Sequence, residues 1–249
     1  MIPIKSEKDL LMLRKSGKIL AKITRKLREY AAAGIATLDL DAYADRLMQE
    51  EGVVSAFKDY KGFPAYICTS VNEEIVHGIP SARKLKEGDI IGLDAGINYQ
   101  GYISDIAVTV GIGRINPTHK KLIAVTKAAL NEGIKKARAG NHLSDISYAV
   151  QTYVERNGFS VVRDFVGHGV GFSLHEDPEI PNFGRPHQGP QLKSGMVLAI
   201  EPMVNAGSWE SRILDNGWTA VTKDGSASAH FEHTVAVTDK GPEILTKLD

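Results

Sequence analysis

Two aspartates in one predicted β-hairpin are the first residues whose types and spacing suggest chemistry. Asp94 and Asp105 lie in the stretch DIIGLDAGINYQGYISDIAVTV (89–110), which predicts two strands joined by a turn over residues 98–101. If that turn is symmetric about its centre, the two aspartates face each other with their Cβ atoms roughly 5 Å apart. Facing carboxylates repel, so either one keeps its proton or a cation lies between them. A three-residue loop would instead send the two side chains to opposite faces.

The C-terminal half of the chain repeats this acidic pattern. The segment 192–201 matches the segment 85–94 in its apolar run, and an acid, Glu201 or Asp94, closes each. Two further pairs occupy similar places around these segments: Asp105 and Glu232 before a β-branched run, and His77 and His168 in a His-Gly pair. We therefore predict a single domain, 1–249, with an internal repeat of about 1–115 and 116–249.

The predicted elements would bring the acids of the two halves together. Helix caps, apolar spacing and glycine stops predict helices over about residues 6–33, 37–51, 116–138 and 143–156. Apolar and β-branched runs predict strands near 66–71, 159–165, 196–202 and 229–238, in addition to the hairpin. Two such halves would pack about an approximate two-fold axis, with sheets inside and helices outside, which is an α+β fold.

Four clustered carboxylates would need cations. Asp94, Asp105, Glu201 and Glu232 carry four negative charges, which two divalent ions would cancel. Oxygen-rich ligation with one or two imidazoles suits Mn, Fe, Co or Zn. Paired metals about 3.5–4 Å apart are typical of hydrolases, because they lower the pKa of a shared water from ~15.7 toward ~7. The acids therefore indicate a hydrolase with two metal ions.

Composition argues against several other classes of protein. Thirty Lys plus Arg balance thirty Asp plus Glu, so no overall field points to nucleic acid or to a membrane. The one cysteine, Cys68, cannot form an internal disulfide and is expected to be a small buried residue. The N-terminus lacks the apolar core of a signal peptide, and no apolar run approaches the ~18 residues of a membrane span. We expect a reduced, cytoplasmic protein.

The histidines are individually ambiguous. His168 in GHGVG is a candidate metal ligand, because its flanking glycines let the backbone approach a site closely. A lone histidine in a loop is more often a surface or capping residue. That structural interpretation stays open for His77, His119, His142, His175, His187, His230 and His233.

Several ordered motifs together resemble the type I methionine aminopeptidases, in their short bacterial form, over essentially the whole chain. They are VHGIP at 76–80, DAG at 94–96 with Asp105 eleven residues after Asp94, GHGVG at 167–171, LHEDP at 174–178, IEPMVNAG at 200–207 and FEHTVAVT at 231–238. The resemblance implies the pseudo-two-fold pita-bread fold, with a central antiparallel sheet covered by helices on its outer face. It also implies a single catalytic domain that removes N-terminal methionine from nascent proteins and peptides, with a small second residue preferred.

The resemblance further implies a role for each site residue. Two divalent ions, of Co, Mn, Fe or Zn, would be held by Asp94, Asp105, His168, Glu201 and Glu232. A bridging hydroxide would attack the first peptide carbonyl, and Glu201 would handle the water proton. His175 would polarise that carbonyl, and His77 would contact the scissile amide and assist the leaving nitrogen. The methionine pocket would be formed by Tyr60, Phe63, Cys68, Phe172, Leu174 and Trp218.

Two alternatives remain beside this interpretation. A Xaa-Pro aminopeptidase of the same fold usually carries a long N-terminal domain, whereas the first helix here starts at about residue 6. A non-catalytic module that binds nascent chains or ribosomes would have lost metal ligands, and all five are present. For the enzyme, the expected partners are nascent polypeptide N-termini, with no membrane contact and a monomeric chain. The basic first helix could also dock the enzyme on the ribosome through phosphate contacts.

Overall fold

The helices begin where side chains satisfy their first backbone N–H groups. In this computed structural model, which describes residues 1–248, Ser6 Oγ accepts a hydrogen bond from the Asp9 N–H at 3.3 Å, and Asn116 Oδ1 accepts one from the His119 N–H at 2.8 Å. The helices are α1 (Glu7–Tyr30), α2 (Thr37–Glu50), α3 (Pro117–Lys136) and α4 (Leu143–Arg156). All the predicted helices are confirmed, with α1 ending at Tyr30, before the expected stop at Gly34.

The sheet of the N-terminal half is built around the predicted hairpin. Strand β4 pairs antiparallel with β5, β2 and β1. The elements of this half are β1 (Val54–Ser55), the short 3-10 helix η1 (Tyr60–Gly62), β2 (Cys68–Val71), β3 (Glu74–Val76), β4 (Ile90–Tyr99) and β5 (Tyr102–Gly111). Buried residues follow one another along most of β4 and β5, so both faces of this hairpin are covered.

The C-terminal half contributes a second large sheet and one small sheet, and it forms another small sheet with β3 of the N-terminal half; the pairings within the described residues are antiparallel. The large sheet has the strand order β15-β14-β9-β7-β8, and the small ones have the orders β13-β10-β6 and β11-β12-β3. The strands are β6 (Ser160–Val161), β7 (Gly167–Gly169), β8 (Glu176–Ile180), β9 (Val197–Ile200), β10 (Met203–Asn205), β11 (Ser211–Ile213), β12 (Ala220–Thr222), β13 (Ser228–His230), β14 (His233–Thr238) and β15 (Gly241–Ile244).

The register of the β4–β5 hairpin differs from the prediction. Gln100 and Gly101 form a two-residue turn with positive φ angles of 54° and 87°, the conformation that a tight hairpin favours. Asp94 therefore pairs with Ala107, and Asp105 pairs with Gly96. The predicted direct opposition of the two aspartates is wrong. They are diagonal neighbours on one face, with a Cβ separation of up to roughly 7 Å, so the alternative with opposite faces is wrong as well.

Two predicted strands are interrupted in ways that matter for the site. The strand expected at 159–165 is reduced to β6, and the strand expected at 229–238 is divided into β13 and β14 by Phe231 and Glu232. In that break the Glu232 N–H donates to the Ala107 carbonyl of β5 at 2.8 Å. The expected loop between β7 and β9 also contains a strand, β8. The break in the C-terminal strand thus places a carboxylate against the hairpin of the other half.

Two threonines join the halves at this junction. Thr234 Oγ1 accepts from the Asp105 N–H at 2.8 Å and donates to the Asp105 carbonyl at 2.8 Å. Thr109 Oγ1 does the same for the backbone of His230, with both distances 2.9 Å. The hydroxyls therefore satisfy backbone groups that a regular strand pairing would otherwise satisfy.

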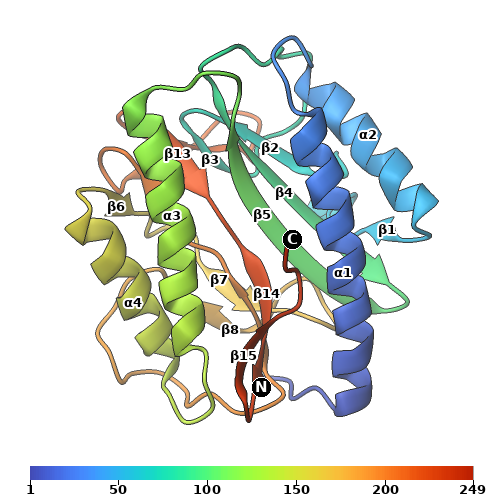
Figure 1. The fold of residues 1–249 in the computed structure, drawn as a ribbon, viewed down its shortest axis with the longest axis vertical. Coiled ribbons are helices and arrows are strands. Elements are labelled where there is room, and N and C mark those ends of the chain that lie inside the picture. The colour runs from blue at the N-terminus through green and yellow to red at the C-terminus, as the bar shows by residue number, and fades with distance from the viewer. Residues whose placement is uncertain (249) are drawn as a thin grey trace.

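The helices lie on one face of the sheets, as the sequence predicted. Figure 1 shows α1 and α2 beside one another over the N-terminal sheet and α3 and α4 over the C-terminal one. The main core lies between these layers and contains side chains from both halves, among them Leu20, Leu130, Ile91 and Leu198. The architecture is therefore α+β with antiparallel sheets covered by helices on their outer face.

Matched backbone hydrogen bonds support the internal repeat. The Gly34 N–H donates to the Leu85 carbonyl at 2.8 Å, and the Gly140 N–H donates to the Leu192 carbonyl at 2.9 Å. The turn that follows also has the same hydrogen bond in each half: the Asp89 N–H donates to the Lys86 carbonyl, and the Met196 N–H donates to the Lys193 carbonyl. Each second helix also begins with a carboxylate that accepts from the N-cap N–H: Asp39 from Ala36 and Asp145 from His142. We propose that residues 1–249 form one domain from two such halves.

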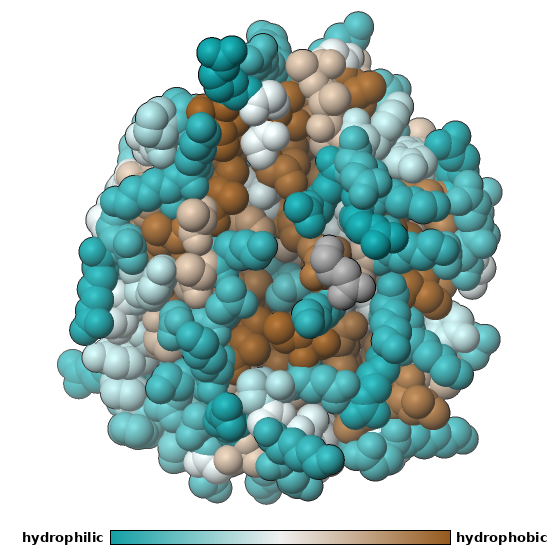
Figure 2. Space-filling view, in the orientation of Figure 1, coloured by the Kyte–Doolittle hydropathy of each residue, from teal (hydrophilic) through white to brown (hydrophobic). Residues whose placement is uncertain are grey.

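The outer face is largely hydrophilic, with hydrophobic side chains visible between the polar ones (Figure 2). Across residues 1–248, none of the helices combines the length and apolar character that spanning a membrane requires. The basic residues of α1 are partly paired, since Arg14, Lys22 and Lys26 form ion pairs with Glu243, Glu51 and Glu50.

Candidate metal centre

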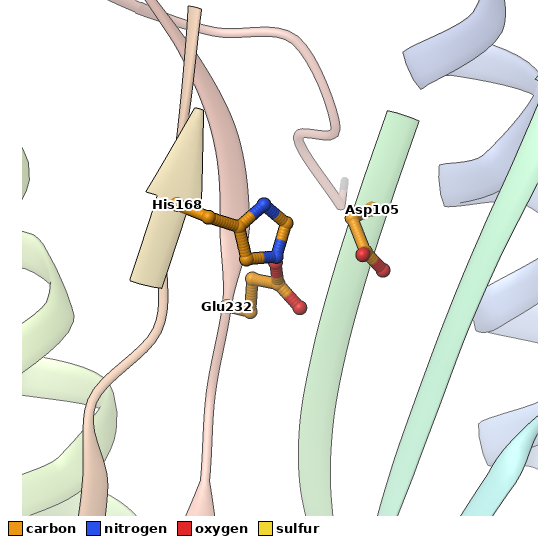
Figure 3. Close-up of side chains that lie close together, drawn as sticks. All are labelled: Asp105, His168 and Glu232. Atoms are coloured by element: carbon orange, nitrogen blue, oxygen red, sulfur yellow. The ribbon is translucent and has the colours of Figure 1, made fainter. Parts of the chain in front are cut away.

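Three predicted ligands from three different strands or strand ends meet inside the sheets. Asp105 comes from β5, His168 from β7 and Glu232 from the break between β13 and β14. One ligand atom of each lies within 4.8 Å of the others, and all three residues are buried (Figure 3). This arrangement is compatible with a shared metal ion.

The other two predicted ligands border this group. Glu201 follows β9, and its Oε1 lies 3.3 Å from His168 Nε2. Asp94 lies on β4, diagonal to Asp105 across the hairpin. All five predicted ligands line one cavity of about 330 Å³. The tertiary structure therefore brings the whole predicted set to one place.

The electrostatics of this cluster call for a cation. Burial raises the pKa of Asp94 to about 7, and burial raises the pKa values of Asp105, Glu201 and Glu232 well above those of free carboxyls. Neighbouring carboxylates contribute to the raised pKa values of Asp94, Asp105 and Glu232. Asp94 Oδ1 and Glu232 Oε1 are buried and accept no hydrogen bond from the described residues. Orphaned carboxylate oxygens beside an imidazole fit divalent metal ions, which would satisfy them and neutralise the charge.

The histidines at the cavity are held neutral. Burial lowers the pKa of His168 to about 3 and that of His77 to about 4. Partial loss of water, helped by the nearby Lys61 charge, lowers the pKa of His175. Neutral imidazoles can accept a proton, donate one N–H or bind a metal ion. His77 has a positive φ of 58°, a strained conformation of the kind that clusters at functional sites.

We expect a histidine next to the centre to make folding pH-dependent. Burial lowers the pKa of His233 to about 4, while its unfolded pKa is near 6.5. Between these values only the unfolded chain takes up the proton, so stability is lost as pH falls, by up to about 1.4 kcal/mol per pH unit. Urea unfolding of metal-free protein between pH 7 and pH 4.5 should show this loss as a difference in stability between the wild type and His233→Gln that grows as pH falls, because the buried carboxyls with raised pKa values act equally in both proteins. Parallel curves for the two proteins would contradict the assignment.

The predicted methionine pocket is largely assembled, with one exception. Tyr60, Phe63, Cys68, Leu174 and Trp218 line the same cavity as the ligands, together with His77 and His175. Phe172 does not line it. The residue is 48% exposed, and its ring lies beside Lys5 and Tyr102 instead. The structure therefore does not bring Phe172 to this cavity.

Sequence reasoning missed other residues that line the cavity. They are Phe57, Lys61, Val76, Asp164, Phe165, Val166 and Met203. The sequence alone also assigns His230 no role at the site. Its side chain is buried, and its Nε2 lies 3.5 Å from Glu201 Oε2 without a hydrogen bond to the described residues. A signal for His230 was available, since it stands two residues before Glu232 at the end of a strand.

A buried group of acids and a histidine beside an apolar cavity, between sheets of two similar halves, defines a metal-dependent hydrolase of the pita-bread fold. Residues 12–239 match the model of metallopeptidase family M24. The chain is 52% identical to a methionine aminopeptidase of Clostridium perfringens, covering 99% of both chains, and 51% identical to methionine aminopeptidase 1 of Bacillus subtilis, covering 100% of both. The chain belongs to metallopeptidase family M24, among its methionine aminopeptidases.

Solved structures agree with this assignment. The chain superposes on the methionine aminopeptidase of Thermotoga maritima with a TM-score of 0.97 at 46% identity, covering 99% of this chain and 100% of that one. It also superposes on the prolidase of Pyrococcus horikoshii with a TM-score of 0.81 at 24% identity, covering 99% of this chain but 64% of the prolidase. The second likeness shows the shared fold alone.

Proposed function

We propose that the protein removes the N-terminal methionine from peptides and nascent proteins by metal-dependent hydrolysis of the first peptide bond. The observation that carries the proposal is the convergence of Asp94, Asp105, His168, Glu201 and Glu232 at one cavity with apolar walls. Full-length relatives at about half identity carry the name methionine aminopeptidase, which supports the choice of substrate.

The chain's own residues can perform the proton transfers of this reaction. Bound divalent ions would supply Lewis acidity and lower the pKa of water toward ~7. Glu201 lies at the ligand cluster, where a carboxylate can take the proton of the attacking water. His175 Nδ1 lies 2.9 Å from the Tyr60 hydroxyl, which orients the imidazole. That leaves Nε2 of His175 to donate to the substrate carbonyl and its developing oxyanion. His77 would contact the scissile amide from its place between Phe165 and Trp218.

An apolar wall beside the acids suits a methionine side chain. Phe63 and Trp218 pack edge to face with ring centroids 5.2 Å apart, and Phe63, Cys68 and Leu174 are buried. Burial raises the pKa of the Cys68 thiol well above its usual value, so the thiol stays neutral and apolar. A flexible thioether gains favourable contacts with aromatic edges and sulfur. We propose this surface as the pocket for the first residue, and we expect small second residues to be preferred.

The number and kind of ions are part of the proposal. Four carboxylates would be balanced by two divalent cations, and the oxygen-rich set with one imidazole suits Mn, Fe, Co or Zn. We further propose that the enzyme is cytoplasmic and monomeric. Association with the ribosome would use exposed basic residues of α1 for phosphate contacts: Lys15, Lys18, Arg25 and Arg28.

Peptide hydrolysis tests the proposal directly. Metal-stripped protein is expected to release methionine from Met-Ala-Ser when Mn, Fe(II), Co or Zn is added back, and to leave Leu-Ala-Ser intact because its pocket is shaped for a thioether chain. Released methionine is measured by chromatography. Cleavage confined to Ala-Pro-Ala would identify a Xaa-Pro aminopeptidase instead, and inactivity with every metal and peptide would indicate a binding module.

A further inference from the structure

A buried lysine near the N-terminus contacts the loop that carries His175. Lys5 is 3% exposed, although lysine is almost never fully buried unless it is paired. Its Nζ forms an ion pair with the carboxylate of Glu176, whose side chain is also buried. Lys5 precedes α1 in sequence and lies outside the catalytic cavity. The pair therefore links the N-terminal segment to residues 171–177, a loop that leads into the first two residues of β8.

Glu176 organises this loop from within. Its Oε1 accepts hydrogen bonds from the backbone N–H groups of Phe172 at 2.6 Å and Ser173 at 3.0 Å. Its Oε2 accepts from Lys5, so both carboxylate oxygens are used. The Lys5 ammonium also lies 4.8 Å from the centroid of the Phe172 ring, a cation–π contact. One lysine thus holds both the carboxylate and the aromatic ring of the loop.

Two glycines leave the space that Lys5 occupies. A Cβ at Gly171, whose φ is 145°, would lie 2.6 Å from Lys5 Cε, and a Cβ at Gly195 would lie 2.8 Å from the Lys5 carbonyl oxygen. The Lys5 N–H also donates to the Gly195 carbonyl at 2.7 Å. The side chain of Lys5 therefore packs against Gly171, and its backbone packs against Gly195. These two contacts fix the position of the ammonium group.

The loop carries two residues of the cavity. Leu174 is 4% exposed and belongs to its apolar wall, and His175 lies with its ring 4.3 Å from that of His168. The side chain of His175 contacts the Tyr60 hydroxyl through Nδ1 and the ring of His168, and the next residue, Glu176, pairs with Gly169 of β7. The position of His175 relative to the centre depends on the loop backbone, and a displacement of about 1 Å in a reacting group costs about 10²-fold in rate.

We propose that Lys5 is a positioning residue of this enzyme: through Glu176 it holds the loop 171–177, and with it His175, at the distance from the metal centre that catalysis requires. The proposal deepens the proposed aminopeptidase function and rests on it for the role of His175. It assigns the N-terminal segment to the active-site machinery, although no residue of that segment touches the cavity.

Lys5→Met tests the proposal because methionine keeps the apolar stem and removes the ammonium. We expect kcat for Met-Ala-Ser to fall by about 10²-fold, measured well below the melting temperature, with a smaller change in KM. Hydrogen exchange of the backbone of residues 171–177 should become clearly faster. Metal affinity, measured by calorimetry with Mn(II), should be retained because His168 is held by its pairing with β9. Lys22→Met is the matched control, since Lys22 forms an ion pair with Glu51 between α1 and α2.

The charge-neutral variant Lys5→Met/Glu176→Gln separates positioning from general destabilisation. Glutamine keeps an oxygen for the Phe172 and Ser173 N–H groups, and it removes the buried unpaired charge. We expect it to recover part of kcat and of the exchange protection of the loop. An unchanged kcat in folded Lys5→Met, or a loss of kcat without faster exchange in the loop, would overturn the proposal. If the wild-type protein releases no methionine, the proposed function fails. Hydrogen exchange still tests whether Lys5, through Glu176, holds residues 171–177 in place.

Discussion

Glu201→Gln is expected to lower kcat for methionine release by ~10²–10⁴-fold, the usual contribution of a positioned acid–base group. Glu201 ends the apolar run of β9 and reaches the ligand cluster, where its two oxygens face His168 and His230 at 3.3 and 3.5 Å. Glutamine has nearly the same shape and keeps one oxygen for a metal ion, but it cannot take a proton from water. The loss should therefore appear in kcat more than in KM.

Steady-state kinetics with saturating metal measure this effect. Glu74→Gln is a matched control, because burial also raises the pKa of Glu74, which accepts a hydrogen bond from Val71 away from the centre. Metal affinity of Glu201→Gln is determined in parallel by calorimetry. Activity near that of the wild type would show that Glu201 is not the proton acceptor.

Metal affinity is expected to rise steeply with pH. Without metal, the pKa of Asp94 is raised to about 7, and those of Asp105, Glu201 and Glu232 lie well above their usual values, so the empty cluster retains protons near neutral pH. Metal ions bind the deprotonated forms and displace these protons. Each proton released makes the affinity rise by up to about tenfold per pH unit.

Calorimetric titration with Mn(II) at pH 6, 7 and 8, in buffers of different ionisation enthalpy, counts the protons released. The stability of the metal-free protein should change with pH in the opposite direction to metal affinity: it should fall as pH rises. Carboxyls with raised folded pKa values stabilise the fold while protonated, and this contribution is lost as pH rises through those values. The difference in melting temperature between metal-loaded and metal-free protein should therefore widen from pH 6 to pH 8. Affinity that does not change with pH would refute a buried, proton-retaining carboxylate cluster.

The β4–β5 hairpin illustrates the limit of local reasoning. The interpretation with a symmetric turn placed Asp94 and Asp105 on one face of the hairpin. That face is correct, because the observed pairing differs from the expected one by two residues, and a shift of two preserves the face. The pairing itself was wrong, because Gln100 and Gly101 both adopt positive φ and tighten the turn. Which residues pair across a hairpin depends on single dihedral angles in its turn. The residue types of the turn constrain those angles only loosely.

The sequence alone determined the elements and the chemistry available to them. Capping residues, apolar periodicity and glycine stops are local, so the starts of α1, α2, α3 and α4 could be predicted. The repeat of acids at the ends of matching segments predicted a metal-binding cluster before any pairing was known. Ordered motifs then assigned the family, and each of the five predicted ligands lies at the cavity.

Which side chains meet depends on how the two halves pack. His230 joins the site because β13 ends beside Glu201, whereas the ring of Phe172 lies outside the cavity, beside Lys5 and Tyr102. Lys5 reaches the loop of His175 across a separation of 171 residues from Glu176 along the chain. Such contacts arise when helices and sheets from both halves bury a common core, and their energetics depend on packing and desolvation that no local pattern contains.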